Sequence, residues 1–81
     1  MNKTIRISNL SRREEEIIKL LAYEYSTKEI ANLLFIGYET VKTHRKNIIA
    51  KLNVKNVAGV IRVAFQKGII QMEENPLRLQ A

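Results

Sequence analysis

A short pattern that starts helices occurs twice in this chain of 81 residues, and it constrains the fold more than any other feature. Ser11 precedes Glu14 by three positions, and Ser26 precedes Glu29 in the same way. In such a capping box the serine hydroxyl and the glutamate carboxylate each accept a hydrogen bond from the other residue's backbone amide. Apolar residues at helical spacing follow both serines. The pattern predicts one helix from Ser11 to Tyr23 or Glu24 and a second from Thr27 to Leu34.

A longer third helix is expected over residues 38–53, after Gly37, which serves as a helix breaker and can act as its N-cap. Its apolar residues fall within an arc of roughly 100° on a helical wheel. These residues are Val41, Ile48, Ile49 and Leu52. Arg45 lies in the same arc. We call the opposite, polar side the reading face, defined by Lys42, Thr43, Lys46 and Asn47.

A fourth helix is expected from Val57 to Lys67, capped by Asn56 and ended by Gly68 as the residue after its C-cap. Its expected core stripe is Val57, Val60, Ile61, Ala64 and Phe65. No strand pattern lies between the helices, so the sequence predicts an all-α fold, a four-helix domain over residues 10–70. Residues 1–9 are expected to form a flexible N-terminal arm, although Thr4 to Ser8 alternate as a short strand would, and residues 71–81 a C-terminal tail.

The composition excludes several classes of protein. The chain has no cysteine and no aspartate, and its only histidine is His44, so we expect no metal site, no cofactor and no enzymatic activity. The carboxylates of the three glutamates that begin the first helix are better explained by the positive end of a helix than by acid–base chemistry. No apolar run reaches the roughly 18 residues of a membrane span, and no signal peptide is visible at the start. We therefore expect a cytoplasmic protein without a membrane partner.

The positive charge is concentrated in one part of the chain. Residues 38–67 hold seven basic residues and a single acid, Glu39, whereas the rest of the chain holds seven of each sign. The formal net charge of +6 therefore belongs to this stretch alone. Such an asymmetry is typical of a protein that binds a polyanion, in the first place a nucleic acid.

The second and third helices are separated by residues 35–37, which include Gly37, and together they form a helix-turn-helix pattern. The major groove of DNA is about 12 Å wide and accepts a helix whose other side is held by a scaffold. Lys42 and Lys46 lie one turn apart and can reach guanine or flanking phosphates, and Thr43 beside them suits a thymine methyl group or an oxygen on a base edge. Single-stranded RNA is a less suitable target, because the chain lacks the aromatic platforms that such recognition uses.

These residues resemble the LuxR-type helix-turn-helix domain of bacterial transcription regulators. The resemblance runs from Leu10 to Ile70 and rests most on Lys28-Glu29-Ile30-Ala31 followed by Thr40-Val41-Lys42-Thr43-His44, with Leu10-Ser11-Arg12-Arg13-Glu14 before and Lys51-Leu52-Asn53-Val54 after. It implies a third helix in the major groove, with Lys42, Thr43 and Lys46 facing bases, and a fourth helix that often dimerises. It also implies that Thr27, Lys28 and Thr40 lie near phosphates.

The chain departs from the family pattern at three places. Glu24 stands where a glycine is usual, which leaves open a remodelled turn or a longer first helix. Arg45 replaces an aliphatic residue and is expected to reach out to a phosphate. An apolar Val57-Ala58-Gly59 removes polar groups from the start of the fourth helix, which leaves phosphate contact there to neighbouring residues. The further expected phosphate contacts are Tyr38, Asn47, Lys55 and Asn56.

Gly59 and Val63 lie together on another face of the fourth helix. A glycine in mid-helix costs about 1 kcal/mol relative to alanine. Close approach of a second copy is one reason for it, and a merely tolerated glycine is the other. The sequence thus predicts a homodimer that binds double-stranded DNA specifically and regulates transcription, with RNA polymerase as a further partner. The alternative is a protein-interaction module of the same fold that has lost DNA reading. The domain is compatible with a stand-alone regulator and with a C-terminal piece of a larger one.

Overall fold

The computed structural model describes residues 10–71 and contains four helices in that range. They are α1 (Arg12–Ala22), α2 (Thr27–Leu34), α3 (Tyr38–Leu52) and α4 (Val57–Gln66). No strand interrupts them within the described residues, so the predicted all-α, four-helix class is confirmed. The predicted N-terminal arm and most of the predicted tail lie outside these residues, and both stay predictions.

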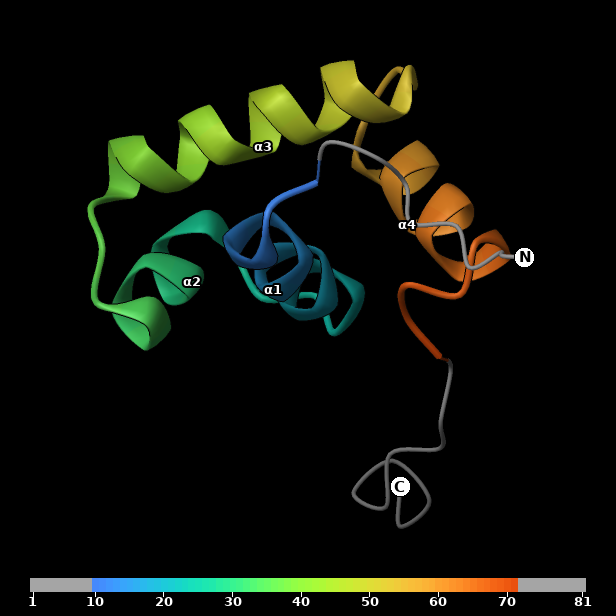
Figure 1. Ribbon diagram of the computed structural model, residues 1–81. Coiled ribbons are helices and arrows are strands. Elements are labelled where there is room, and N and C mark those ends of the chain that lie inside the picture. The colour runs from blue at the N-terminus through green and yellow to red at the C-terminus, as the bar shows by residue number, and fades with distance from the viewer. Residues whose placement is uncertain (1–9, 72–81) are drawn as a thin grey trace, which may run out of the picture.

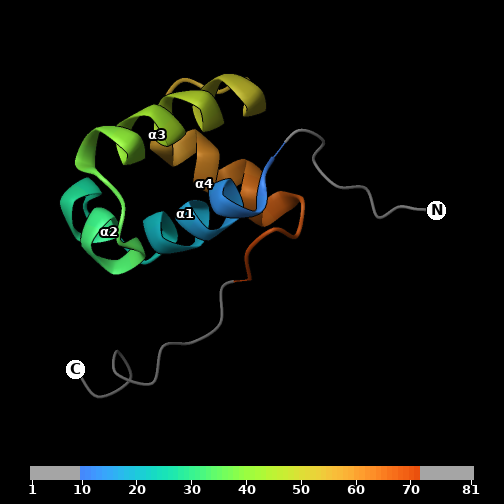
Figure 2. The ribbon, with the colours of Figure 1, turned by 60° about the vertical axis from the view of Figure 1, so that its left-hand side comes forward.

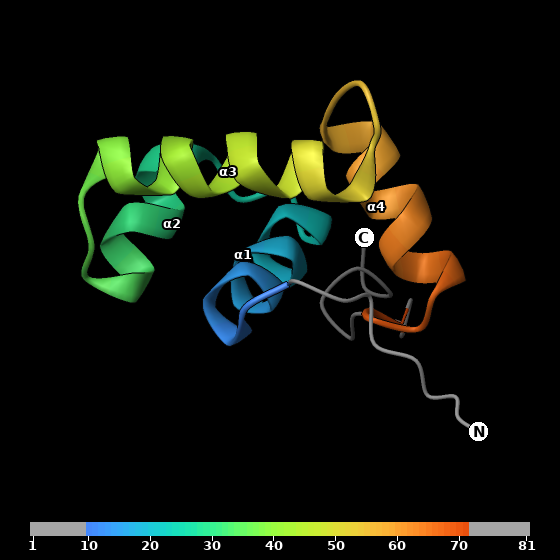
Figure 3. The same ribbon diagram turned by 45° about the horizontal axis from the view of Figure 1, so that its top comes forward.

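The longest helix, α3, contacts all three of the others (Figure 1). α2 lies against its N-terminal half, α1 beneath its middle and α4 at its C-terminal end (Figure 3). Turning the molecule shows that these helices all lie on one side of α3 (Figure 2). The other side of α3 carries no helix of the described part of the chain.

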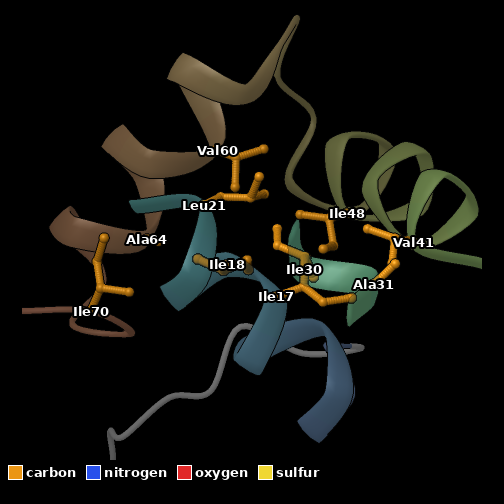
Figure 4. Close-up of a cluster of buried hydrophobic side chains, with 10 residues drawn as sticks. All are labelled: Ile17, Ile18, Leu21, Ile30, Ala31, Val41, Ile48, Val60, Ala64 and Ile70. Atoms are coloured by element: carbon orange, nitrogen blue, oxygen red, sulfur yellow. The ribbon is translucent and has the colours of Figure 1, made fainter. Parts of the chain in front are cut away.

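Side chains from all four helices and from the segment after α4 meet in one apolar core (Figure 4). Ile17 and Ile18 of α1, Ile30 of α2 and Ile48 of α3 are completely buried. The other core residues are Leu21, Ala31, Val41, Val60, Ala64 and Ile70. The apolar arc predicted on α3 is confirmed, with Val41 and Ile48 buried and Ile49 and Leu52 packed against the core.

Both predicted capping boxes are present. The amide of Glu14 donates to the Ser11 hydroxyl at 3.0 Å, and the Ser11 amide donates to the Glu14 carboxylate at 2.9 Å. Ser26 and Glu29 form the same pair of bonds at 3.1 and 2.8 Å. Two residues thus satisfy backbone donors that the first turn of each helix leaves without a helical partner.

Within residues 10–71, three residues other than glycine hold a left-handed backbone, and each lies where a helix ends. They are Glu24 (φ 71°), Phe35 (φ 58°) and Asn53 (φ 56°). The backbone of Glu24 decides between the two alternatives for the turn after α1, a remodelled turn and a longer helix. The helix stops at Ala22 without lengthening, and Glu24 itself adopts the positive φ that suits glycine.

Two expectations about α4 need revision. Phe65 was expected in the core stripe but is 53% exposed, so this expectation is wrong. Its position follows Ala64, which fills the core site at that turn. Gly59 meets Val54 of its own chain, because a Cβ atom added at Gly59 would lie 2.7 Å from Val54 Cβ. A close contact inside the domain therefore explains the glycine, and the mid-helix cost no longer points to a second copy.

Candidate nucleic-acid interface

The reading face lies on the uncovered side of α3. Its four residues are all exposed, whereas Val41 and Ile48 on the opposite side are fully buried. Core packing thus fixes the rotation of the helix about its axis. As a result Lys42, Thr43 and Lys46 are presented to solvent together, as the sequence predicts.

The first turn of α3 holds a small charged cluster. Lys42 Nζ lies 3.8 Å from the Glu39 carboxylate and 5.6 Å from the centre of the Tyr38 ring. All three residues are exposed. The contacts are weak in water, but they hold the Lys42 ammonium on the outer side of the helix at its N-terminal end.

Arg45 and Thr27 join α3 to the start of α2. A guanidinium nitrogen of Arg45 donates to the Thr27 hydroxyl, and Thr27 is buried while Arg45 is partly exposed. The sequence predicts a phosphate contact for each side chain, whereas the structure shows that the two side chains bind each other. Their phosphate contacts stay predictions, which now depend on the other guanidinium nitrogens of Arg45 and on the backbone at the start of α2.

An ion pair between Glu14 and Lys51 was not foreseen. Lys51 Nζ lies 2.9 and 3.0 Å from the two carboxylate oxygens of Glu14. Glu14 itself is only 3% exposed. Burial raises the pKa of this carboxyl, but the hydrogen bonds from Lys51 and Ser11 and the charges of Lys51 and His44 together outweigh burial and lower the pKa below its ordinary value. Lys51 therefore neutralises a buried acid, and its charge is not simply part of a surface for a polyanion.

The remaining predicted phosphate contacts lie at the surface. Tyr38 is 50% exposed. Lys28, Thr40, Asn47, Lys55 and Asn56 are exposed as well. Asn56 also caps α4 as predicted, because its side-chain oxygen accepts a hydrogen bond from the Gly59 amide at 3.1 Å. The structure thus supplies exposed polar groups at the starts of α2, α3 and α4, where helix dipoles favour an anion.

α2, the turn over residues 35–37 and α3 form a helix-turn-helix unit, and α3 carries the exposed cationic face. This arrangement defines a helix-turn-helix domain. The family model for bacterial regulatory proteins of the luxR family matches residues 8–64. The chain therefore belongs to the luxR family of bacterial regulatory proteins and is a LuxR-type DNA-binding domain. This family consists of transcription regulators and is not an enzyme family.

Similar proteins agree with this assignment. The chain is 41% identical over 61 residues to the oxygen regulatory protein NreC of Staphylococcus carnosus, covering 75% of this chain and 28% of NreC. It is 45% identical over 62 residues to the response regulator protein VraR of Staphylococcus aureus, covering 76% of this chain and 30% of VraR. The chain thus matches less than a third of the length of either relative.

Two solved structures share the fold. The transcription factor GerE superposes with a TM-score of 0.76 at 38% identity, covering 79% of this chain and 96% of GerE. The response regulator ChrA of a heme-sensing two-component system superposes with a TM-score of 0.74 at 41% identity, covering 78% of this chain and 31% of ChrA.

Among the described residues, no helix combines the length and apolar character needed to cross a membrane.

Proposed function

We propose that this chain binds double-stranded DNA in a sequence-specific way, with α3 in the major groove, and thereby regulates transcription in the cytoplasm. The observation that carries the proposal is the two-sided character of α3. Its inner side is locked into the core by Val41 and Ile48, and its outer side presents Lys42, Thr43 and Lys46 to solvent. The descriptions of GerE as a transcription factor and VraR as a response regulator support the same function.

Base reading falls to the reading face. Lys42 and Lys46 are four residues apart and share one side of the helix. Each ammonium can donate to the O6 and N7 acceptors of guanine, and the methyl group of Thr43 can pack on a thymine methyl group. Affinity that is independent of sequence comes from phosphate contacts by the exposed polar groups around this face.

A single domain of this size offers a small interface, so tight binding calls for two copies on neighbouring half-sites. We propose that α4 supplies the contact between copies. Ala58, Arg62 and Phe65 are exposed at positions that share one side of α4, beside the predicted contacts Gly59 and Val63. An exposed Phe65 suits an interface better than a free surface. Contact with RNA polymerase stays a prediction.

The test is a fluorescence titration of labelled duplexes with the purified chain, over a range of salt concentrations. A random duplex measures the salt-dependent phosphate term, and a duplex selected from a random pool measures the specific term. We expect both terms, with much tighter binding of the selected duplex. Absence of salt-dependent binding below about 100 mM salt would overturn the proposal and favour a protein-interaction module of the same fold.

A further inference from the structure

Glu39 carries a negative charge on a surface whose other charged groups suit phosphates and the hydrogen-bond acceptors of bases. It is the only acidic residue between positions 38 and 67. It precedes Lys42, Thr43 and Lys46 by three, four and seven positions, so the four side chains share one side of α3. Its side chain is 82% exposed. Glu39 therefore lies on the same side of α3 as the reading face and extends it toward the N-terminus of the helix.

A carboxylate in this place is costly unless DNA gives it a partner. Phosphates repel it, and closing the interface removes its water. In the major groove the amino group of cytosine is a donor without an acceptor beside it on the same base, whereas the amino group of adenine lies next to the N7 acceptor. Cytosine N4 is accordingly the base-edge group that best satisfies Glu39.

The neighbouring Lys42 needs the opposite partner. Its ammonium lies 3.8 Å from the Glu39 carboxylate and is held from a second side by the Tyr38 ring. Guanine presents two acceptors, O6 and N7, to such a donor, whereas thymine presents one. In a C·G base pair, cytosine N4 and guanine O6 are joined by a hydrogen bond, so they lie about 3 Å apart.

We infer that Glu39 and Lys42 act as a pair that reads a single C·G base pair. Glu39 accepts from cytosine N4, and Lys42 donates to guanine O6 or N7 of the same base pair. The 3.8 Å between the two charged groups in the free chain is close to the roughly 3 Å between cytosine N4 and guanine O6, so a small adjustment brings each group to its partner. This inference rests on the proposed DNA binding and adds a specificity-determining role for Glu39.

The test is selection of bound duplexes from a random pool by the unaltered chain, Glu39→Ala, Lys42→Ala and a control, Glu16→Ala. The control removes an exposed carboxylate on α1, so its change in net charge equals that of Glu39→Ala. We expect Glu39→Ala and Lys42→Ala to lose preference at the same C·G position, by about fivefold or more each, with other positions unchanged. Glu16→Ala should select the original sequence.

Three results would overturn the inference while the proposed function stands. One is an unchanged selected sequence for Glu39→Ala, the second is loss of preference at different positions in the two variants, and the third is a shared position that is not C·G. Failure of the unaltered chain to enrich any sequence would instead reject the proposed function. Equal melting temperatures for all variants check that the fold is intact, as the exposure of both side chains leads us to expect.

Discussion

Lys51 and Glu14 link the C-terminal part of α3 to the first turn of α1, with Lys51 Nζ within 3.0 Å of both carboxylate oxygens. The same carboxylate caps α1 through the Ser11 amide. One buried acid thus joins the start of the first helix to the helix that carries the reading face, and this contact fixes both.

Replacing Lys51 with methionine should lower the free energy of unfolding by about 1–3 kcal/mol, because a buried carboxylate loses a charged partner. Urea denaturation at neutral pH measures the loss. Lys55→Met is the control, since Lys55 is exposed and its replacement should change stability by less than about 0.5 kcal/mol. Equal effects of both substitutions would contradict a structural role for the ion pair.

The low pKa of Glu14 predicts acid sensitivity with a definite sign. Because the folded pKa lies below the unfolded one, the carboxylate contributes stability above the unfolded pKa of about 4.3, and this contribution is lost as the pH falls through the folded pKa. Urea midpoints measured from pH 7 down to about pH 3 should fall less steeply in Glu14→Gln than in the unaltered chain. Glu16→Gln, which removes an exposed carboxylate from the same helix, is the control for the loss of one negative charge.

Glu24→Gly should stabilise the domain by about 1 kcal/mol, since a residue with a Cβ is strained at a φ of 71° and glycine is not. A rise in melting temperature is the readout. Asn53→Gly provides the comparison, because asparagine tolerates the left-handed region and its replacement should help less. A lower melting temperature for Glu24→Gly would show that its side chain matters more than its backbone.

Gly59→Ala should destabilise the domain despite the higher helix propensity of alanine, by about 1–2 kcal/mol net. The added Cβ would meet Val54 Cβ at 2.7 Å, and backbone has to shift to relieve this contact. Gly37→Ala is the comparison without a clash, because its Cβ would meet only Thr40 Oγ1 at an ordinary 3.6 Å, and its cost should be limited to that of an alanine at the N-cap of α3. Thermal unfolding of dilute protein compares them, and a stabilised Gly59→Ala would refute the close contact.

Lys46→Ala should cost about 1–3 kcal/mol of binding to the preferred duplex and little on random DNA, if its ammonium donates to a base. Lys55→Ala should instead weaken binding to all sequences alike and reduce the salt slope by about one, as a phosphate contact does. Titrations of both duplexes at several salt concentrations separate the two patterns. Equal loss of affinity on both duplexes would show that Lys46 contacts a phosphate and not a base.

Local chemistry explains why much of the fold was predictable. The capping boxes at Ser11 and Ser26 and the C-terminal glycine Gly68 act within a few residues, so their sequence patterns are sufficient to place helix ends. The reading face was predictable because the 3.6-residue period of a helix places it on the side opposite to the buried Val41 and Ile48.

Contacts between distant residues escaped prediction. Glu14 and Lys51 are 37 residues apart, and Arg45 and Thr27 are 18 apart, so no local pattern connects them. The exposure of Phe65 has the same origin, because helix periodicity alone does not decide how far the core extends around α4. Gly59 was singled out correctly as unusual, but its neighbour Val54 became visible only when the turn between α3 and α4 was placed.

The one-sided packing of α3 separates two kinds of sequence change. Substitutions at Lys42, Thr43 or Lys46 leave the core untouched, because all three residues are exposed. A library randomised at these sites should therefore yield folded members with altered operator preference at high frequency. The DNA preference of such a domain can therefore be changed through its contacts in the groove, while its folding stability stays the same.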